Sequence, residues 1–205
     1  MYEDYFIPYP TIETPDLRLR MVRRSDAKQL YELCSRPETS KYSMWSPHSS
    51  LGVTKRFISY QLTALRRHCC TFFVIEQKST GNVIGTCSYV SFDDSYKVAE
   101  IGYSILRELW GRGYATQAAG ALTGYAFERI GAQRVFARVL PENTASAAVL
   151  KKLGFGFEGR HKKEYYYNGI SADIDVYAMT DDEYAKGDEN GTEADSQLQR
   201  ESQHA

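Results

Sequence analysis

One turn constrains the fold of this chain more than any other feature of its sequence. In the stretch WGRGYATQAAGALTGYAF, residues 110–127, Gly111 and Gly113 flank an arginine directly before an uninterrupted, alanine-rich helical pattern. Glycine lets a backbone take positive φ angles and approach a bound group, and the first amides of a helix bind anions. The turn therefore predicts a strand–turn–helix unit whose backbone binds an anion.

Apolar periodicity predicts the elements on both sides of this turn. Strand patterns are found at 17–22, 71–77, 82–92, 97–106, 134–140, 157–167 and 170–179, the last two joined by a turn at Asn168-Gly169. Helical spacing and capping residues indicate helices at 25–34, 51–67, 116–129 and 143–154, with a Ser- and Pro-rich loop at 36–50. This order predicts one α+β domain with a mostly antiparallel sheet and a single strand–helix–strand crossover.

The domain is predicted to span residues 1–183. The strand at 17–22 alternates apolar and basic residues, so we expect one of its faces to be buried. From Gly187 onward the chain is polar, acidic and without aromatic residues. This composition predicts a disordered C-terminal tail at 184–205.

The charge balance argues against several classes of partner. The chain has 25 basic and 26 acidic residues, so no net field favours nucleic acid or an anionic membrane, and neither is expected. The apolar runs are too short to span a bilayer, and the start does not resemble a secretory signal. The four cysteines and four histidines show no metal-ligand spacing. We therefore expect no metal site, and reduced thiols in a cytoplasmic protein.

The residues of the glycine turn have three other interpretations. A dinucleotide-binding fold places its glycine motif after the first strand of a doubly wound sheet, whereas here several antiparallel strands precede it and too little chain follows. The triphosphate-binding pattern GxxxxGK[ST] is absent from the sequence. The third reading, a tight turn with no ligand, stays open on the residues of the turn alone.

The surrounding motifs give the turn a family resemblance. WGRGYA resembles the (Q/R)xxGxG/A loop of the GCN5-related N-acetyltransferase (GNAT) family, with Gly113 and Ala115 in the last two positions. Trp110 replaces the usual Gln or Arg, as in the WGxGYATEA loop of the ribosomal-protein N-terminal acetyltransferase branch. Three further stretches are similar to that branch: TPDLRLR at 14–20, AEIGYSI at 99–105 and NTASAAVLKKLGF at 143–155. The resemblance runs in order through residues 11–181.

The resemblance implies the GNAT fold and acetyl-CoA as co-substrate. In this fold a mixed, mostly antiparallel central sheet has helices on both faces and a V-shaped splay between the fourth and fifth strands, here 97–106 and 134–140. The pyrophosphate would contact the amides of residues 111–116, and the pantetheine would lie along 103–105. The implied cofactor-binding residues are Tyr103, Ser104, Ile105, Gly111, Arg112, Gly113, Tyr114, Ala115, Thr116, Asn143 and Ser146. For Arg112 a solvated side chain is the alternative.

The resemblance also implies direct attack of a primary amine on the thioester. The sequence has no GxSxG elbow and no cysteine with an evident histidine partner, which agrees with a reaction without an acyl-enzyme. Glu100 is the candidate base, directly or through water, and its structural alternative is an exposed strand glutamate that makes a cross-strand pair. Ser146 is the candidate proton donor, with Asn143 as a helix N-cap and a contact to cofactor or intermediate. Many family members have a tyrosine where this chain has Leu150.

The acceptor is the least determined part of the prediction. Tyr42 and Trp45 are the candidate substrate contacts, with aromatic core packing as their alternative. The branch implies the N-terminal α-amine of a protein, of the ribosomal type. The alternatives are a small amine (a polyamine, amino acid or antibiotic) and a coenzyme A-binding domain without turnover. A monomer or a homodimer is expected.

Overall fold

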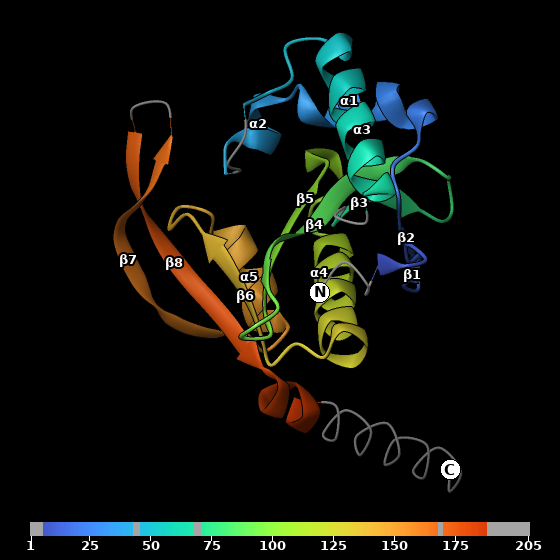
Figure 1. Ribbon diagram of the computed structural model, residues 1–205. Coiled ribbons are helices and arrows are strands. Elements are labelled where there is room, and N and C mark those ends of the chain that lie inside the picture. Colours follow the sequence, from blue (N-terminus) through green and yellow to red (C-terminus); the bar gives the residue numbers. More distant parts are fainter. Residues whose placement is uncertain (1–5, 43–45, 68–70, 168–169, 188–205) are drawn as a thin grey trace, which may run out of the picture.

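A computed structural model describes residues 6–42, 46–67, 71–167 and 170–187 of the chain. An eight-stranded sheet forms its centre, in the order β1-β2-β3-β4-β5-β6-β8-β7 (Figure 1). The strands are β1 (Ile12–Glu13), β2 (Leu17–Arg20), β3 (Phe72–Gln77), β4 (Val83–Asp93), β5 (Val98–Ile105), β6 (Arg134–Val139), β7 (Gly156–Tyr167) and β8 (Ile170–Thr180). Every strand predicted from the sequence is present, and the short β1 is an addition to them.

The sheet is splayed between β5 and β6. These two strands are parallel, and their register covers three residue pairs that end at Glu100 and Phe136. Beyond that point β5 pairs with β4 as far as Ile105, while β6 pairs with β8 as far as Val139. All other neighbouring strands are antiparallel. The predicted V-shaped splay is therefore confirmed, between the strands that the sequence predicted as fourth and fifth.

Helices cover both faces of the sheet, as predicted. The helices are α1 (Ala27–Cys34), α2 (Pro37–Ser40), α3 (Leu51–Arg66), α4 (Tyr114–Tyr125) and α5 (Thr144–Lys152). One buried cluster joins α1 and α3 to the sheet through residues such as Ile58 and Val74. A second and larger cluster joins α4 and α5 to it through Leu122 and Leu150. Figure 1 shows α1 and α3 together above the sheet and α4 below them.

The short helix α2 corrects the prediction of a loop at 36–50. Pro37 is the first residue of α2, where its missing N–H leaves no hydrogen bond unmade. The Ser40 hydroxyl donates to the carbonyl of Pro37 at 3.1 Å and completes the single turn. One turn is too short to show a helical period in a sequence, so periodicity missed it.

Strand β2 is buried on both faces rather than on one. Leu17 and Leu19 are fully buried in the cluster under α4. On the opposite face Arg20 is 5% exposed, and its guanidinium contacts Asp26 at 2.9 Å and Glu76 at 2.6 Å. A buried charge with two carboxylate partners is stable where an unpaired one is not. This network joins β2, β3 and the start of α1.

The end of the domain differs from the prediction. Residues 181–187 are helical, so residues 184–187 are not part of a disordered tail. The Tyr184 ring stacks on Phe127 with centroids 4.9 Å apart, and its hydroxyl donates to Glu128 at 2.7 Å. These tertiary contacts hold a polar helix that sequence composition does not reveal. Trp45, the Asn168-Gly169 turn and the predicted tail from residue 188 lie outside the described residues.

Candidate active site

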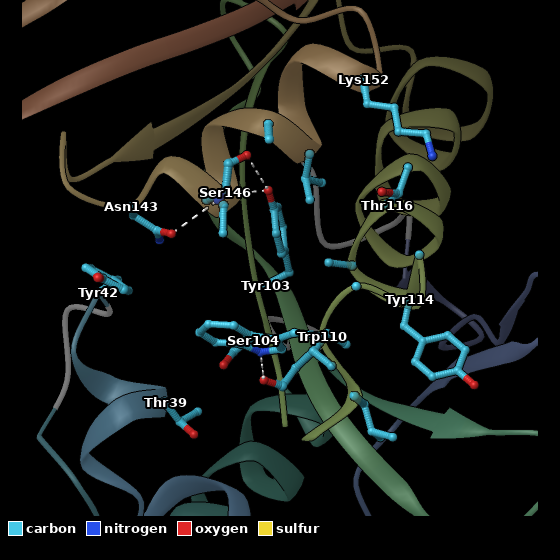
Figure 2. Close-up of a pocket in the computed structure, with 18 of the residues that line it drawn as sticks. Thr39, Tyr42, Tyr103, Ser104, Trp110, Tyr114, Thr116, Asn143, Ser146 and Lys152 are labelled. Atoms are coloured by element: carbon cyan, nitrogen blue, oxygen red, sulfur yellow. Dashed lines mark hydrogen bonds between the residues drawn. The ribbon is translucent and has the colours of Figure 1, made fainter. Parts of the chain in front are cut away.

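A cavity of about 410 Å³ opens where β5 separates from β6. It lies between the glycine turn, the first turn of α4 and the start of α5, with α2 at one edge (Figure 2). Its lining residues are Glu38, Thr39, Tyr42, Tyr103, Ser104, Ile105, Leu109, Trp110, Gly111, Gly113, Tyr114, Ala115, Thr116, Asn143, Ala145, Ser146, Ala148, Val149 and Lys152. Every predicted cofactor residue except Arg112 lines this cavity. The side chain of Arg112 is exposed instead.

The glycine turn has the backbone that its residues predict. Gly111 has a φ of 75° and Gly113 a φ of 80°, in the left-handed region that favours glycine. A Cβ placed on either residue would meet no atom within 4 Å, so open space lies above both. The indole nitrogen of Trp110 donates to the carbonyl of Ile105 at 2.8 Å and fastens the turn to the end of β5. The tryptophan therefore has a structural use at a position where the family signature has Gln or Arg.

The first turn of α4 presents free amides to the cavity. The amide of Gln117 donates to the carbonyl of Gly113 at 3.0 Å, and the first amides of a helix have no acceptor within it. Those amides lie at the positive end of the helix dipole. Side chains fix the turn in place, because Gln77 donates to the Tyr114 hydroxyl at 2.8 Å and Gln117 donates to Asp16 at 2.7 Å. The arrangement suits a bound anion.

Tyr103 and Ser146 meet at the point of the splay. Their hydroxyl oxygens are 3.0 Å apart, and the Ser146 carbonyl lies 3.3 Å from the same tyrosine oxygen (Figure 2). Burial raises the pKa of Tyr103 to about 12, while the hydrogen bond from Ser146 acts in the opposite direction. The phenol therefore keeps its proton near neutral pH and remains a hydrogen-bond donor. The motif around Tyr103 predicted a contact through its backbone and gave no signal for this hydroxyl.

Asn143 caps α5, as predicted. Its side-chain oxygen accepts from the amide of Ser146 at 3.2 Å, which orients the first turn of the helix toward the splay. Leu150 is fully buried in the core and lines neither cavity described here. The helix position at which many family members place a tyrosine thus faces packed side chains in this chain.

A second cavity, of about 550 Å³, meets the first at the splay. It lies toward α3, with walls from α3 and β3 and a floor from β4 and β5. The two cavities share Tyr42, Tyr103, Ser104, Asn143 and Ser146, all labelled in Figure 2. The remaining lining residues are Cys34, His48, Phe57, Tyr60, Gln61, Ala64, Thr71, Phe72, Thr86, Cys87, Ser88, Tyr89, Val90, Glu100, Ile101, Gly102, Ala137 and Arg138.

Glu100 lines the second cavity and is ion-paired. Its carboxylate is 4% exposed and accepts two hydrogen bonds from Arg138, at 2.9 and 3.1 Å, and one from Ser91 at 3.0 Å. The glutamate is therefore buried, whereas the structural alternative assumed an exposed cross-strand pair. Arg138 was missed, although the alternation of RVFARV in β6 places it on the same face as Glu100 of the parallel neighbour. The role of Glu100 as a base stays a prediction.

The described residues contain neither a candidate metal site nor a helix that could span a membrane. The described residues contain no group of three or more His, Cys, Asp or Glu side chains able to hold a metal ion. None of the helices in the described ranges combines the length and apolar character needed to cross a bilayer.

Comparison with known sequences gives consistent matches. The family model for the Acetyltransferase (GNAT) domain matches residues 16–156, more than half of the 205-residue chain. The uncharacterized N-acetyltransferase p20 of Bacillus licheniformis is 33% identical over 175 residues, which cover 85% of this chain and 98% of the relative. A spermidine N(1)-acetyltransferase of Escherichia coli (strain K12) is 25% identical over 75% of this chain and 80% of its own length.

Solved structures share the architecture. A GNAT-family acetyltransferase from Bacillus anthracis has a TM-score of 0.76 at 23% identity, covering 84% of this chain and 99% of its own. RimL, a ribosomal alpha-N-protein acetyltransferase in complex with coenzyme A, has a TM-score of 0.73 at 24% identity, covering 83% and 98%. At these identities the likeness shows the fold, and what the cavities bind must be argued from their residues.

Proposed function

We propose an acceptor and a site chemistry from one premise: this chain belongs to the GNAT acetyltransferase family and is an acetyl-CoA-dependent N-acetyltransferase. The proposed acceptor is the N-terminal α-amine of a protein. The observation that carries the proposal is the meeting of two cavities at Tyr103, Asn143 and Ser146. Cofactor and acceptor can enter from different sides and bring thioester and amine together at that point.

We assign acetyl-CoA to the first cavity. Its pyrophosphate fits the free amides at the start of α4, and the open space above Gly111 and Gly113 lets the backbone approach it. The edge of β5 beyond Glu100 has no partner in β6, so its backbone groups can pair with the amides of the pantetheine arm. The bound cofactor supplies the activated acetyl group as a thioester.

The reaction is a direct transfer. The neutral amine attacks the thioester carbonyl carbon and the new C–N bond forms. The C–S bond then breaks, the sulfur takes a proton and leaves as a thiol, and the proton that the attacking nitrogen loses restores the proton donor by way of solvent. Ser146 is the proposed donor to the departing sulfur, and the protonated Tyr103 hydroxyl at 3.0 Å holds the serine in position. An α-amine has a reference pKa of about 8, so a fraction of the acceptor molecules is already neutral at physiological pH. Glu100 or a water then needs to accept a single proton.

An N-terminal α-amine is favoured over a lysine side chain by this chemistry. A lysine amine has a reference pKa of about 10.4, so the removal of its proton requires a stronger base than the removal of a proton from an α-amine. The Glu100 carboxylate already accepts hydrogen bonds from Arg138 and Ser91. The ribosomal acceptor named for RimL agrees with an α-amine. The spermidine acetyltransferase among the relatives makes a polyamine the second candidate.

The test uses the full-length purified chain. Peptides that carry a free α-amine, the same peptides with a blocked N-terminus and an internal lysine, and spermidine are incubated with acetyl-CoA, and the products are identified by mass spectrometry. We expect acetylation at the α-amine and equimolar thiol release. Acetylation of spermidine but of no peptide would refute the proposed acceptor, and absence of acetyl-CoA binding by calorimetry would refute the cofactor assignment.

A further inference from the structure

We propose that the second cavity selects acceptors whose N-terminal residue has a bulky apolar or aromatic side chain, and that it disfavours polycations. The inference rests on the proposed function, because it concerns the substrate class of the same site. It follows from the walls, the floor, the charge and the size of the cavity.

The walls of the cavity are aromatic. Phe57 of α3 and Phe72 of β3 meet edge to face with ring centroids 5.1 Å apart, and His48 lies 5.6 Å from the Phe57 ring. Tyr60, one turn further along α3, lines the same cavity and is 69% exposed at its rim. Aromatic rings that line a cavity offer a large apolar contact area, and such walls favour an apolar ligand group.

The floor is made of small residues. Ser88 of β4 pairs in register with Phe72 on one side and with Gly102 of β5 on the other. A Cβ on Gly102 would come within 2.9 Å of a methyl group of Val90, so a larger residue there would displace the Val90 side chain. Thr86 and Ser104 continue this small-residue floor. A side chain of the acceptor can fill the space above this floor, opposite the aromatic wall.

The cavity offers little to a second positive charge. Among the described residues that line it, Glu100 is the one acid, and Arg138 already neutralises it. Burial lowers the pKa of His48, so its ring is neutral near pH 7 and brings no charge into the cavity. A second ammonium group would lose its hydration without gaining a carboxylate. A polyamine acceptor is therefore penalised, whereas an apolar side chain gains from leaving water.

The cavity has the size to hold the first one or two residues of an acceptor peptide rather than the surface of a folded protein. Its volume of about 550 Å³ lies in the range of small-ligand sites. Tyr60 is 69% exposed and Val90 is 50% exposed, so these two residues mark the side of the cavity that is open to solvent. The rest of a peptide can leave there, while its first side chain stays inside.

The experiment compares peptides that differ in their first residue alone. Leu, Phe, Ser and Asp are placed before one constant sequence, spermidine is included, and kcat/KM is measured by thiol release. We expect the Leu and Phe peptides to exceed the Ser peptide by about tenfold or more, the range that an apolar pocket gives. The Asp peptide and spermidine should be the poorest acceptors.

Two variants and a matched control locate the selectivity. Ser88→Phe fills the floor and should abolish the preference for Leu while the Kd for acetyl-CoA stays within twofold. Tyr60→Ala removes part of the exposed rim and should lower kcat/KM for the Phe peptide more than for the Ser peptide. Tyr96→Ala is the control, because Tyr96 is 74% exposed in the β4–β5 turn and lines neither cavity. It should behave as the unmodified chain.

The outcomes separate the inference from the proposed function. Equal kcat/KM for the Leu, Ser and Asp peptides would overturn the inference and leave the α-amine acceptor intact. Acetylation of spermidine with no acetylated peptide would instead overturn the proposed function. If Ser88→Phe does not fold, the exposed Tyr60→Ala still decides, since an unchanged Phe-to-Ser ratio in that variant would contradict the assigned wall.

Discussion

The hydroxyl groups of Tyr103 and Ser146 lie 3.0 Å apart at the junction of the two cavities. Tyr103 comes from β5 and Ser146 from the first turn of α5, so neither element alone forms the pair. Asn143 fixes the serine by accepting its amide hydrogen. In the proposed reaction this pair takes the place of the tyrosine that many family members have where this chain has the buried Leu150.

Removal of the serine hydroxyl should slow the chemical step. We expect Ser146→Ala to lower kcat by about a hundredfold, the usual cost of losing a proton donor or an oxyanion donor. Tyr103→Phe should lower kcat by about tenfold, because the serine loses one partner and keeps its own hydroxyl. The Kd for acetyl-CoA, measured by calorimetry, should change little in both. Unchanged kcat in Ser146→Ala would remove the serine from the mechanism.

The pH profile tests the same pair. Because burial raises the pKa of Tyr103 to about 12, the phenol stays protonated through neutral and mildly alkaline pH. The kcat/KM profile should therefore rise with pH as the acceptor amine loses its proton with a pKa of about 8. No falling limb from ionisation of Tyr103 is expected below about pH 10. Tyr103→Phe should leave the position of that rise unchanged. A falling limb that disappears in Tyr103→Phe would contradict the assignment.

Glu100 raises a separate question, because it is both buried and ion-paired. If it accepts the amine proton, Glu100→Gln should lower kcat more for a lysine-type amine than for an α-amine, since the lysine holds its proton more tightly. Arg138→Met is the matched variant, because it removes the ion-pair partner and keeps the carboxylate. Equal losses of activity for both amines in Glu100→Gln would indicate a structural ion pair.

At the scale of elements, the glycine turn and the start of α4 form the proposed anion site. Gly113→Val should weaken acetyl-CoA binding by about tenfold or more, because its Cβ would fill the space that the proposed pyrophosphate approaches. Gly81→Val is the matched control. Gly81 has a φ of 70°, close to the 80° of Gly113, and open space around it, yet it lies in the β3–β4 turn away from both cavities. Both changes bring similar strain, about 1–2 kcal/mol. A similar loss of affinity for acetyl-CoA in both would argue against the proposed anion site at the glycine turn.

Most elements were predictable because their signals are local. The alternation in β3 to β5, the Asn143 cap of α5 and the glycine turn lie within a few residues of sequence. Helix α2 was missed because one turn has no period, and the helix at 181–187 because its support is the distant Phe127. Candidate residues on the glycine turn and β5 were found from motifs, whereas Arg138 and the Tyr103 hydroxyl needed the sheet to be assembled.

At the scale of the whole molecule, a buried ion network stabilises the part of the fold formed by β2, β3 and the start of α1, which includes one side of the second cavity. Arg20 joins Asp26 and Glu76, so β2, β3 and the start of α1 depend on it. Glu76→Gln should lower the free energy of unfolding by about 3 kcal/mol, because it leaves a buried guanidinium short of one partner. Glu13→Gln should cost about 1 kcal/mol or less, because the Glu13 side chain is 47% exposed where it pairs with Arg18. Urea denaturation measures both, and equal costs would contradict a supporting role for the network.

The family resemblance, the order of the elements and the strand–turn–helix unit at the glycine turn can be recognised in the sequence, because helix signals, glycine requirements and strand alternation act over a few neighbouring residues. The residue at which β5 and β6 separate, the contact between Tyr103 and Ser146 and the lining of the second cavity follow only from the assembled fold. The second cavity is built from α1, α3, α5, β3, β4, β5 and β6, with lining residues from Cys34 to Ser146. No local pattern encodes their meeting, because burial of a common core brings them together.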